Sequence, residues 1–490
     1  MSFELGDLSY ALPILVLVVG GLLLLLMEAF STGRSRAYLV PMTVLVVLAS
    51  IAADVSVWSQ VGEGGHSIMS GMLEIDRLSL FANAIFLTAC GLTALLAGAY
   101  MQEHRFEFGE FYALIVFATA GMMILAAASD MVSIFLGLEI MSLAVYVLTG
   151  SWRRSPKSSE GAMKYFLVGS VASAVLLYGM ALIYGAVGST SLQAIANSKG
   201  AYVEPIFIIG LLLVLTAFAF KIAAVPFHMW APDAYEGAPT PVTGFMAAGV
   251  KAAAFVILIR MCGTAFSRSE LALGSTGWVS ILKWVAVITM TFGNLAALRQ
   301  ENIKRLLAYS SVSHAGYLLI GLIATATVGN EARGPLLYYL AAYTFTTMGA
   351  FGVVAWLGRH GDERLQLDDW AGLAAKHPAA ALAMTIFMLS LGGVPPTAGF
   401  FGKFYLFRAA LGRADLTWLV VIAVLNSVVS VYYYLRVVTT MYFREPARES
   451  SPLQSRSVTA ALVLAVIGTL LIGILPGWLV ETASSALLGS

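Results

Sequence analysis

The sequence predicts an all-α polytopic membrane protein, and three observations support that prediction. Hydrophobic residues make up 59% of the 490 residues and charged residues only 11%, whereas roughly a quarter of a soluble domain is charged. The mean hydropathy is +0.85. Apolar residues fall in successive windows of about 20, the length with which an α-helix crosses a bilayer. Water could not solvate so much apolar surface, so a bilayer must cover it.

The apolar windows predict about fourteen transmembrane helices. They cover residues 8–30, 37–59, 78–101, 109–128, 131–150, 159–187, 203–225, 240–264, 276–297, 303–323, 335–358, 378–408, 415–442 and 457–482. The first is expected to be a membrane helix rather than a cleaved signal peptide, because its apolar core is too long and no positive charge precedes it.

Positive charges in the connections predict the orientation, because Lys and Arg concentrate in loops on the inner side of a membrane. With the N-terminus outside, fifteen fall on the inner side: Arg34, Arg36, Arg105, Arg153, Arg154, Lys157, Arg299, Lys304, Arg305, Arg359, Arg364, Lys376, Arg444, Arg448 and Arg456. Six fall on the outer side: Arg77, Lys199, Arg268, Arg333, Arg408 and Arg413. This excess predicts that both termini lie outside.

Two of the predicted helices are expected to be broken. The seventh contains FKIAAVPFHMW, in which Lys221 precedes the helix-breaking Pro226 by five residues. The twelfth covers 378–408, which as one straight helix would be about 46 Å long against a hydrocarbon core of about 30 Å. Pro395–Pro396 supply its break, and Lys403 follows seven residues later.

The order of lysine and break is reversed between these two helices. Interrupted helices in corresponding positions of two halves indicate inverted repeats around a transport path at the middle of the membrane. The repeats are expected at 109–264 and 276–442, with five helices each, after an N-terminal three-helix segment at 1–108 and before a C-terminal helix at 457–490. Two unrelated proline kinks are the alternative.

Four lysines fall within predicted helices: Lys164, Lys221, Lys251 and Lys403. A charge at the centre of a bilayer costs roughly 2.5–3.5 kcal/mol on insertion scales, so such residues are rarely kept without a function. Lys251 lies eleven residues into its helix, about 17 Å deep, with no acid nearby in the sequence. A lysine buried in this way can accept and release a proton at physiological pH.

One acid and two histidines complete the candidates. Glu139, in SIFLGLEIMSLAVYVL, is the clearest buried acid, and a structural ion pair with Lys164 is the alternative to a role in proton transfer. His228 follows the seventh-helix break and His314 lies at mid-depth, and for both, packing or capping stands beside proton relay. Arg260 lies near a helix end and is expected to reach the membrane surface.

Composition argues against several other classes of site. The net charge of +1 gives no sign of a nucleic-acid partner. Cys90 and Cys262 stand alone within apolar windows, which supports neither a disulfide framework nor a zinc or iron–sulfur site. The glycines lie mostly inside apolar helices and form no nucleotide-binding loop. No cofactor or metal is expected in this chain.

The chain closely resembles the antiporter-like membrane subunits of proton-pumping NADH:quinone oxidoreductase, respiratory complex I, in the stretches KIAAVPFHMWAPDAYEGAPTPVTGF, GLEIMSLAVYVLTG and LGGVPPTAGFFGKFYLF. The resemblance covers almost the whole sequence. It is closest to the bacterial N type, because HMWAPDAYEGAPTPVT follows the first break, Lys403 stands where the M type is expected to have glutamate, and the long lateral helix of the L type is lacking.

The resemblance implies a function and a set of residues. Such a subunit translocates protons across the membrane, coupled to electron transfer from NADH to quinone. The matching positions are Glu139 as the buried acid of the fifth helix, Lys164 as its modulating lysine on the sixth, Lys221 before the break, Lys251 as the central lysine, Lys403 as the outer lysine, and His228 and His314 as relay residues.

The resemblance also implies partners and a location. The partners would be the other membrane-arm subunits and the lipid bilayer of a bacterial inner membrane, with both termini on the periplasmic side. FMN, iron–sulfur clusters, NADH and quinone are expected in partner subunits. The alternatives are a subunit of a multi-subunit cation/proton antiporter or membrane-bound hydrogenase, a structural subunit that only anchors partners, and a solute transporter. The intramembrane lysines argue against an anchor, and the lack of a substrate-sized polar cluster argues against a solute transporter.

Overall fold

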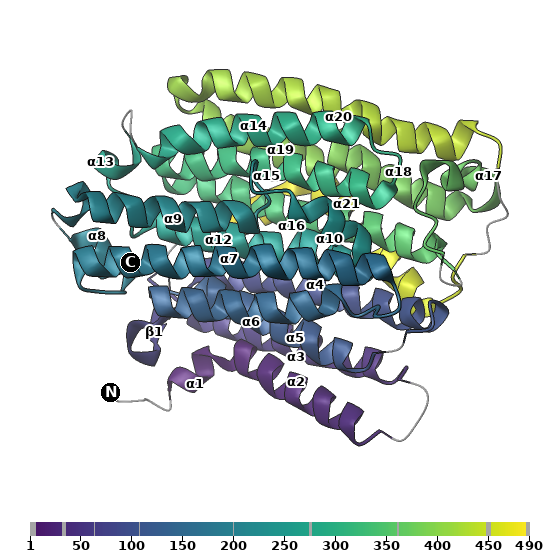
Figure 1. Ribbon diagram of the computed structural model, residues 1–490, viewed down its shortest axis with the longest axis horizontal. Helices are drawn as coiled ribbons and strands as arrows, with labels where there is room; N and C mark the ends of the chain where they lie inside the picture. Colours follow the sequence, from purple (N-terminus) through teal and green to yellow (C-terminus); the bar gives the residue numbers. More distant parts are fainter. Residues whose placement is uncertain are drawn as a thin grey trace.

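The computed structural model describes residues 6–31, 36–62, 64–106, 108–198, 200–273, 277–359, 362–446 and 452–486. Arg34, Lys199 and Arg448, which entered the charge count above, lie outside the described residues, as does the predicted helix boundary at residue 276. Within the described residues almost every regular element is a helix, and the long helices run side by side along one direction (Figure 1). The predicted helical membrane protein is confirmed.

Twelve helical segments of the described chain are long and apolar enough to cross a membrane. They are α2 (Leu12–Ala29), α3 (Leu39–Gln60), α4 (Arg77–Glu103), α5 (Glu110–Ala127), α6 (Met131–Thr149), α7 (Pro156–Val187), the continuous segment Thr240–Gly263, α14 (Trp278–Leu298), α15 (Ile303–Val328), α16 (Arg333–Leu357), the segment Ala414–Phe443 that contains α20 (Thr417–Phe443), and α21 (Arg456–Ile474). The segment Thr240–Gly263 consists of α11 (Thr240–Phe245), the π-helical turn η3 (Met246–Val250) and α12 (Lys251–Gly263).

Two further segments each consist of two shorter helices. The first pairs α9 (Pro205–Lys221) with α10 (Trp230–Gly237), and the second pairs α18 (Pro378–Gly392) with α19 (Ala398–Leu411). If each pair crosses the membrane once, the total is the predicted fourteen. The expected end of the first helix at residue 225 is wrong, because α9 ends four residues earlier and Ala223 already has a φ of 56°. Pro226 cannot continue a helix, since its ring would clash with the carbonyl group four residues before it.

Short elements occupy the two ends of the bundle. They are α1 (Asp7–Tyr10), α8 (Leu192–Asn197), α13 (Ser269–Ala272), α17 (Leu373–Lys376), α22 (Pro476–Ser484) and the 3₁₀ turns η1 (Met69–Gly71), η2 (Ala201–Val203), η4 (Asn330–Ala332), η5 (Leu367–Trp370) and η6 (Ala414–Leu416). Strands β1 (His66–Ile68) and β2 (Leu73–Ile75) form an antiparallel hairpin with His66 opposite Ile75. This hairpin is a small departure from the predicted all-α fold, and its three-residue strands are too short for alternating hydrophobicity to reveal.

Burial separates central helices from peripheral ones. The apolar window of Thr240–Gly263 is 100% buried, and those of α15 and α16 are 94% and 89% buried. The windows of α2 and Ala414–Phe443 are each only 33% buried. Figure 1 shows α2 and α20 at opposite edges of the molecule, with α12, α15 and α16 between them. The apolar side chains that α2 and α20 expose are therefore the surface that lipid or a neighbouring subunit would cover.

Glycines allow two helix pairs to pack closely. A Cβ on Gly121 of α5 would lie 2.6 Å from the backbone nitrogen of Met141 on α6, and one on Gly137 would lie 2.7 Å from that of Leu125. A Cβ on Gly316 of α15 would likewise lie 2.7 Å from a backbone nitrogen of α14. Larger residues would separate these backbones, as is general where small residues line helix contacts in membranes.

The first and the last described residues lie at the same end of the bundle. Figure 1 shows α1 at the end that carries β1, α8 and α13, opposite α17. At that end Asp7 faces His66 of the hairpin at 3.6 Å, and a Cβ on Gly334 at the start of α16 would touch Ser484 of α22.

Candidate functional site

Three of the predicted lysines are buried in the bundle: Lys221, Lys251 and Lys403 are 4%, 2% and 5% exposed. Each follows or precedes an irregularity in its helix, namely the break after α9, the π-helical turn before α12 and the break before α19. Among the described residues none of the three forms an ion pair with a carboxylate, and each donates instead to hydroxyl or carbonyl oxygens. These lysines can therefore exchange a proton without first breaking a salt bridge.

Lys221 is the last residue of α9 and reaches α6. Its Nζ donates to Ser142 Oγ at 2.8 Å and to the Tyr146 hydroxyl at 3.1 Å. Glu139 lies three residues before Ser142 on the same helix, is half-buried, and accepts a hydrogen bond from Ser173 of α7. The charge of Glu139 is near enough to act on Lys221, although the two residues form no ion pair among the described residues. The structure therefore brings these two predicted residues together.

Lys251 opens α12 directly after the π-helical turn. Its Nζ donates to the carbonyl oxygen of Ser311 at 2.5 Å and to the hydroxyl of the same residue, and it lies 5.8 Å from the ring centre of Tyr343. A π-helical turn changes the direction of the side chains that follow it and is frequent at functional sites. Here it precedes the lysine that lies in the most deeply buried span.

His314 links the surroundings of Lys251 to α16 and α20. Its Nδ1 lies 2.6 Å from the Tyr339 hydroxyl and its Nε2 lies 3.1 Å from the Tyr434 hydroxyl. Tyr434 is also hydrogen-bonded to Ser310, the neighbour of the serine that accepts from Lys251. Both ring nitrogens thus meet hydroxyl groups that can donate or accept, as proton relay requires.

Lys403 completes the row on α19. Its Nζ donates to the carbonyl oxygens of Leu391 and Gly392 at 3.0 and 3.2 Å, at the end of α18, and to Ser427 Oγ at 2.9 Å. The last carbonyl groups of a helix lack partners within the helix and favour a positive charge. The Lys403 Nζ also lies 5.1 Å from the ring centre of Tyr317, whose ring is 5.7 Å from that of His314. Polar and aromatic side chains therefore connect Lys251, His314 and Lys403.

The sequence pattern of the family described as NADH:quinone oxidoreductase/Mrp antiporter, TM, matches residues 128–430, which include the three buried lysines, Glu139 and His314. The chain belongs to this family. It is 47% identical to NADH-quinone oxidoreductase subunit N 1 of Sorangium cellulosum over 99% of both chains, and 44% identical to NADH-quinone oxidoreductase subunit N of Trichlorobacter lovleyi over 99% of this chain and 98% of the relative.

Solved structures agree with this membership. A chain of respiratory complex I from Thermus thermophilus with bound aureothin has a TM-score of 0.81 and 33% identity, covering 97% of this chain and 100% of its own length. A chain of the Mrp complex from Dietzia has a TM-score of 0.84 at 23% identity, covering 98% of this chain and 97% of its own length. The second similarity shows that the two chains share a fold.

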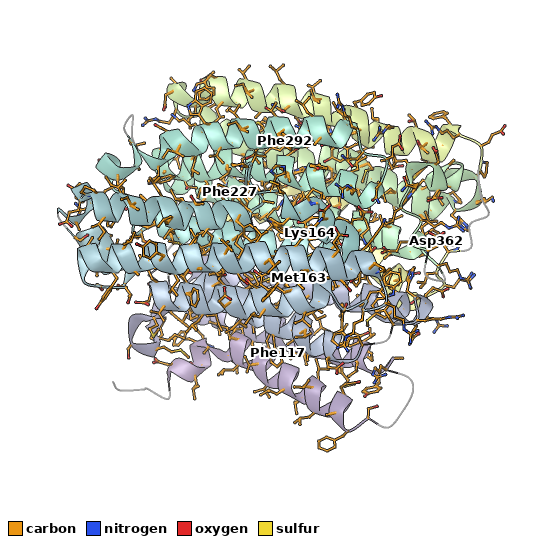
Figure 2. All side chains as sticks on the ribbon, in the orientation of Figure 1. Phe117, Met163, Lys164, Phe227, Phe292 and Asp362 are labelled. Carbon is orange, nitrogen blue, oxygen red and sulfur yellow. The ribbon has the colours of Figure 1, made fainter. Side chains whose placement is uncertain are left out.

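Two predicted residues of this family member, Lys164 and His228, form no hydrogen bond with the three buried lysines among the described residues. Lys164 on α7 has a side chain that is 45% exposed, and it pairs with Asp233 and Glu160 at 2.7 Å each; Figure 2 labels it near the middle of the view. The ion pair considered between Glu139 and Lys164 is absent among the described residues. His228 is buried against Phe292, with ring centres 4.7 Å apart, and its Nδ1 has no hydrogen-bond partner within the described chain.

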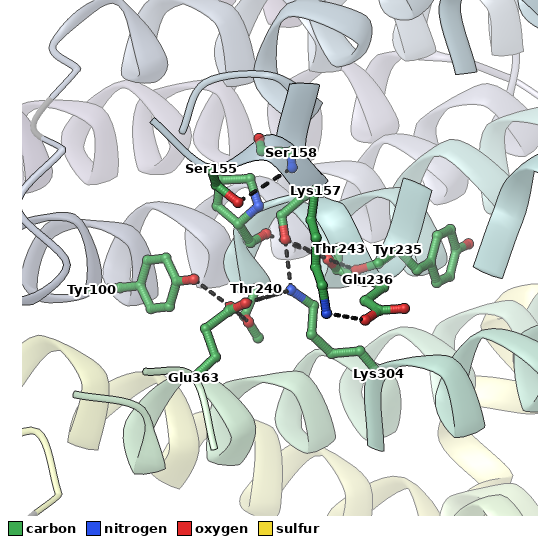
Figure 3. Close-up of polar contacts among 12 residues, drawn as sticks. Tyr100, Ser155, Lys157, Ser158, Tyr235, Glu236, Thr240, Thr243, Lys304 and Glu363 are labelled. Carbon is green, nitrogen blue, oxygen red and sulfur yellow. Dashed lines mark hydrogen bonds and ion pairs between the residues drawn. The ribbon is translucent and has the colours of Figure 1, made fainter. Parts of the chain in front are cut away.

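Sequence reasoning missed a buried ion pair at the end of the bundle that carries α17. Lys304 was counted as a loop charge, but its side chain is fully buried and lies 3.2 Å from both carboxylate oxygens of Glu363 (Figure 3). Thr240 donates to the same carboxylate at 2.5 Å, and the Tyr100 hydroxyl donates to it as well. The only signal in the sequence was that Lys304 is the second residue of an apolar window.

A second buried pair corrects the expectation for Arg260. This arginine does not extend to the surface of the molecule: it is 2% exposed and donates to Asp76 Oδ1 at 2.8 Å and to the Ala126 carbonyl at 2.9 Å. Asp76 is itself fully buried at the start of α4. Its position near the end of a helix suggested exposure, but α4 and α5 pack against α12 and cover this residue.

The Tyr434→Phe substitution is expected to destabilise the protein by about 1–3 kcal/mol, because it leaves Ser310 and His314 Nε2 without their shared buried partner. Thermal unfolding of the detergent-purified chain would measure this loss. Tyr432→Phe is the matched control, since Tyr432 lies two residues away on α20 and is 64% exposed. Equal unfolding temperatures for the two variants would show that the hydroxyl bridge does not stabilise the fold.

Proposed function

We propose that this chain is the N-type membrane subunit of an NADH:quinone oxidoreductase and that it translocates protons, coupled to electron transfer from NADH to quinone. The observation that carries the proposal is the set of three buried lysines that have no carboxylate partner among the described residues, Lys221, Lys251 and Lys403. Serine, histidine and tyrosine side chains connect the last two of them. Two relatives named as subunit N support the same function, and they match this chain at 47% and 44% identity over nearly their whole length.

The proposed mechanism is electrostatic. While the Glu139 carboxylate is near Lys221, it stabilises the ammonium form of that lysine. If Glu139 moves toward Lys164, Lys221 loses this support and releases its proton toward Lys251, then toward Lys403 and out. At an effective dielectric constant of about 20, doubling a separation of about 4 Å changes the interaction by about 2 kcal/mol, which makes proton release about thirtyfold easier.

His314 acts as the relay between the last two lysines in this mechanism. The imidazole can take a proton at one ring nitrogen while it gives one up at the other. Its two tyrosine partners, Tyr339 and Tyr434, hold the ring so that each nitrogen faces a hydroxyl group. His228 is proposed as a further relay residue after the first break, supported by its buried and unpartnered Nδ1.

Residues 109–264 and 276–442 are proposed to form two inverted repeats. Three features support this: each half begins with two helices in glycine contact, α5–α6 and α14–α15; each contains one interrupted helix; and the lysine precedes the break in the first half but follows it in the second. The segments 1–108 and 457–490 would then flank the repeats. Lys221 and Lys403 occupy related places in the two halves under this proposal.

The proposed partners, location and cofactors follow from membership in such a complex. We propose the other membrane-arm subunits as partners, a bacterial inner membrane as the location, and periplasmic termini, which the fifteen inner positive charges against six outer ones support. FMN, iron–sulfur clusters, NADH and quinone are proposed for partner subunits. Within the described residues no three His, Cys, Asp or Glu side chains gather in a way that could hold a metal ion.

The Lys221→Ala substitution tests this function. NADH oxidation linked to quinone and proton uptake should both fall on the order of tenfold or more in membrane vesicles, because proton transfer by a positioned group contributes at least that much. Lys283→Ala is the control, since Lys283 pairs with Asp415 at 3.0 Å at the edge of the bundle. A native gel must show the assembled complex. Wild-type rates in an assembled Lys221→Ala complex would contradict proton translocation through this chain.

A further inference from the structure

The Lys304–Glu363 pair lies among titratable groups that the mechanism above leaves unused. The Glu363 carboxylate belongs to the loop between α16 and α17, and its side chain is only 11% exposed. It receives hydrogen bonds from Tyr100 of α4, Thr240 of α11 and Lys304 of α15 (Figure 3). Because three separate helices donate hydrogen bonds to it, this loop carboxylate has a fixed position and is not a solvated surface charge.

The site is joined to the break between α10 and α11. Lys304 Nζ donates to the carbonyl oxygen of Ala238 at 2.6 Å, in the two-residue connection between these helices. Lys304 and Ser311 lie on the same helix, α15, about 10.5 Å apart along its axis. Ser311 accepts from Lys251, and the Tyr235 side chain of α10 lies beside Ser311. Lys304 therefore lies on the side of Lys251 that faces the α17 end of the bundle.

His104 connects the same site to the surface. It follows α4, is 4% exposed, and neither ring nitrogen has a hydrogen-bond partner among the described residues. Its ring packs on that of Tyr100, with centres 4.4 Å apart, and the Tyr100 hydroxyl is the one that donates to Glu363. Buried polar groups are almost always hydrogen-bonded, so these two nitrogens point to a route for water or protons.

A cavity of about 400 Å³ opens beside Glu103, the residue that precedes His104. Its lining consists mainly of polar residues and includes Gln102, Glu103, Arg359 and Gln454. Glu103 directly precedes His104, and Arg359 follows Gly358, where a Cβ would lie 3.3 Å from His104 Nε2. Burial lowers the pKa of His104 from its ordinary 6.5, with Lys304 acting in the same direction and Glu363, Glu103 and Asp362 acting against it. A neutral ring can accept a proton at one nitrogen.

We propose that His104, Glu363 and Lys304 form an inlet that takes protons from the end of the bundle carrying α17 and delivers them toward Lys251. His104 accepts a proton from water in the polar cavity and passes it to a Glu363 oxygen. The neutral carboxyl group no longer stabilises the Lys304 ammonium, so Lys304 gives its proton inward, toward Ser311 and Lys251. Glu363 then returns its proton to Lys304. One proton enters and one moves on.

The Glu363→Gln substitution in the whole complex tests the inlet. It keeps the size of the side chain and one acceptor oxygen but cannot take up a proton. Proton uptake by membrane vesicles should fall about tenfold at pH 8 and less at pH 6, because uptake becomes limiting when protons are scarce. Asp368→Asn is the matched control on the same loop, where Asp368 has a side chain that is 78% exposed. Unchanged uptake by assembled Glu363→Gln at both pH values overturns the inlet.

Chemical rescue separates relay from structural support. The His104→Gly variant should lose uptake, and added imidazole should restore it severalfold, which a purely structural defect would not allow. The inlet rests on the proposed function, and Lys251→Ala distinguishes their failures. If Lys251→Ala loses translocation but Glu363→Gln and His104→Gly do not, only the inlet is wrong. If Lys251→Ala translocates protons normally, the proposed function itself fails.

Discussion

The Lys251→Met substitution is expected to lower proton translocation on the order of a hundredfold in the assembled complex, with quinone-linked NADH oxidation falling alongside it. Methionine has about the same length as lysine and tolerates an apolar surrounding, so the helix should keep its packing. The lost group is the ammonium that donates to both oxygens of Ser311. Every proposed proton passes through this position, since it lies between the inlet and His314.

Lys251→His provides the discriminating comparison. A histidine can still accept and release a proton, so we expect it to retain a measurable fraction of translocation, well above that of Lys251→Met. Parallel assays of proton uptake and NADH oxidation in vesicles would rank the two variants against wild type. If both variants lose activity to the same degree, geometry at this position matters more than titration, and the relay through Lys251 would be contradicted.

Local features of the sequence were enough to predict the spans and the breaks. A transmembrane helix must satisfy its own backbone hydrogen bonds in lipid, so a run of about 20 apolar residues is nearly sufficient to predict it. Prolines act in the same local way: α9 ends before Pro226, and α18 ends before Pro395–Pro396. Lys221, Lys251 and Lys403 were candidates because a charge in lipid is costly whatever surrounds it.

The partners of the buried charges could not be predicted, because they depend on tertiary packing. Arg260 and Asp76 are 184 residues apart in the sequence, and Lys304 and Glu363 are 59 apart. Distance from a helix end indicates the depth of a residue in the membrane but not which helices cover it. Arg260 was therefore expected to lie at the surface. For Lys164 the sequence indicated depth along α7, whereas its exposure depends on which face of that helix packs inward.

The Asp76→Ala substitution should destabilise the chain by about 3–5 kcal/mol, because it leaves the Arg260 charge buried without its partner. Arg333 is near enough for its positive charge to repel that of Arg260. In the wild-type protein the negative charge of Asp76 offsets this repulsion. Asp76 also caps α4 by accepting from the Ser79 backbone nitrogen at 2.9 Å, and loss of that cap costs about 1 kcal/mol more.

Cys90 and Cys262 are both buried, so a thiol-reactive dye added during heating reports when the detergent-purified chain unfolds. The dye should react at a clearly lower temperature in Asp76→Ala than in wild type. Asp76→Asn keeps an oxygen for the cap but loses the charge, so it isolates the cost of the broken ion pair. Combining Asp76→Asn with Arg260→Met should recover part of the stability, because it removes the uncompensated charge. If the double variant is less stable than Asp76→Asn alone, the buried charge of Arg260 is not the source of the loss.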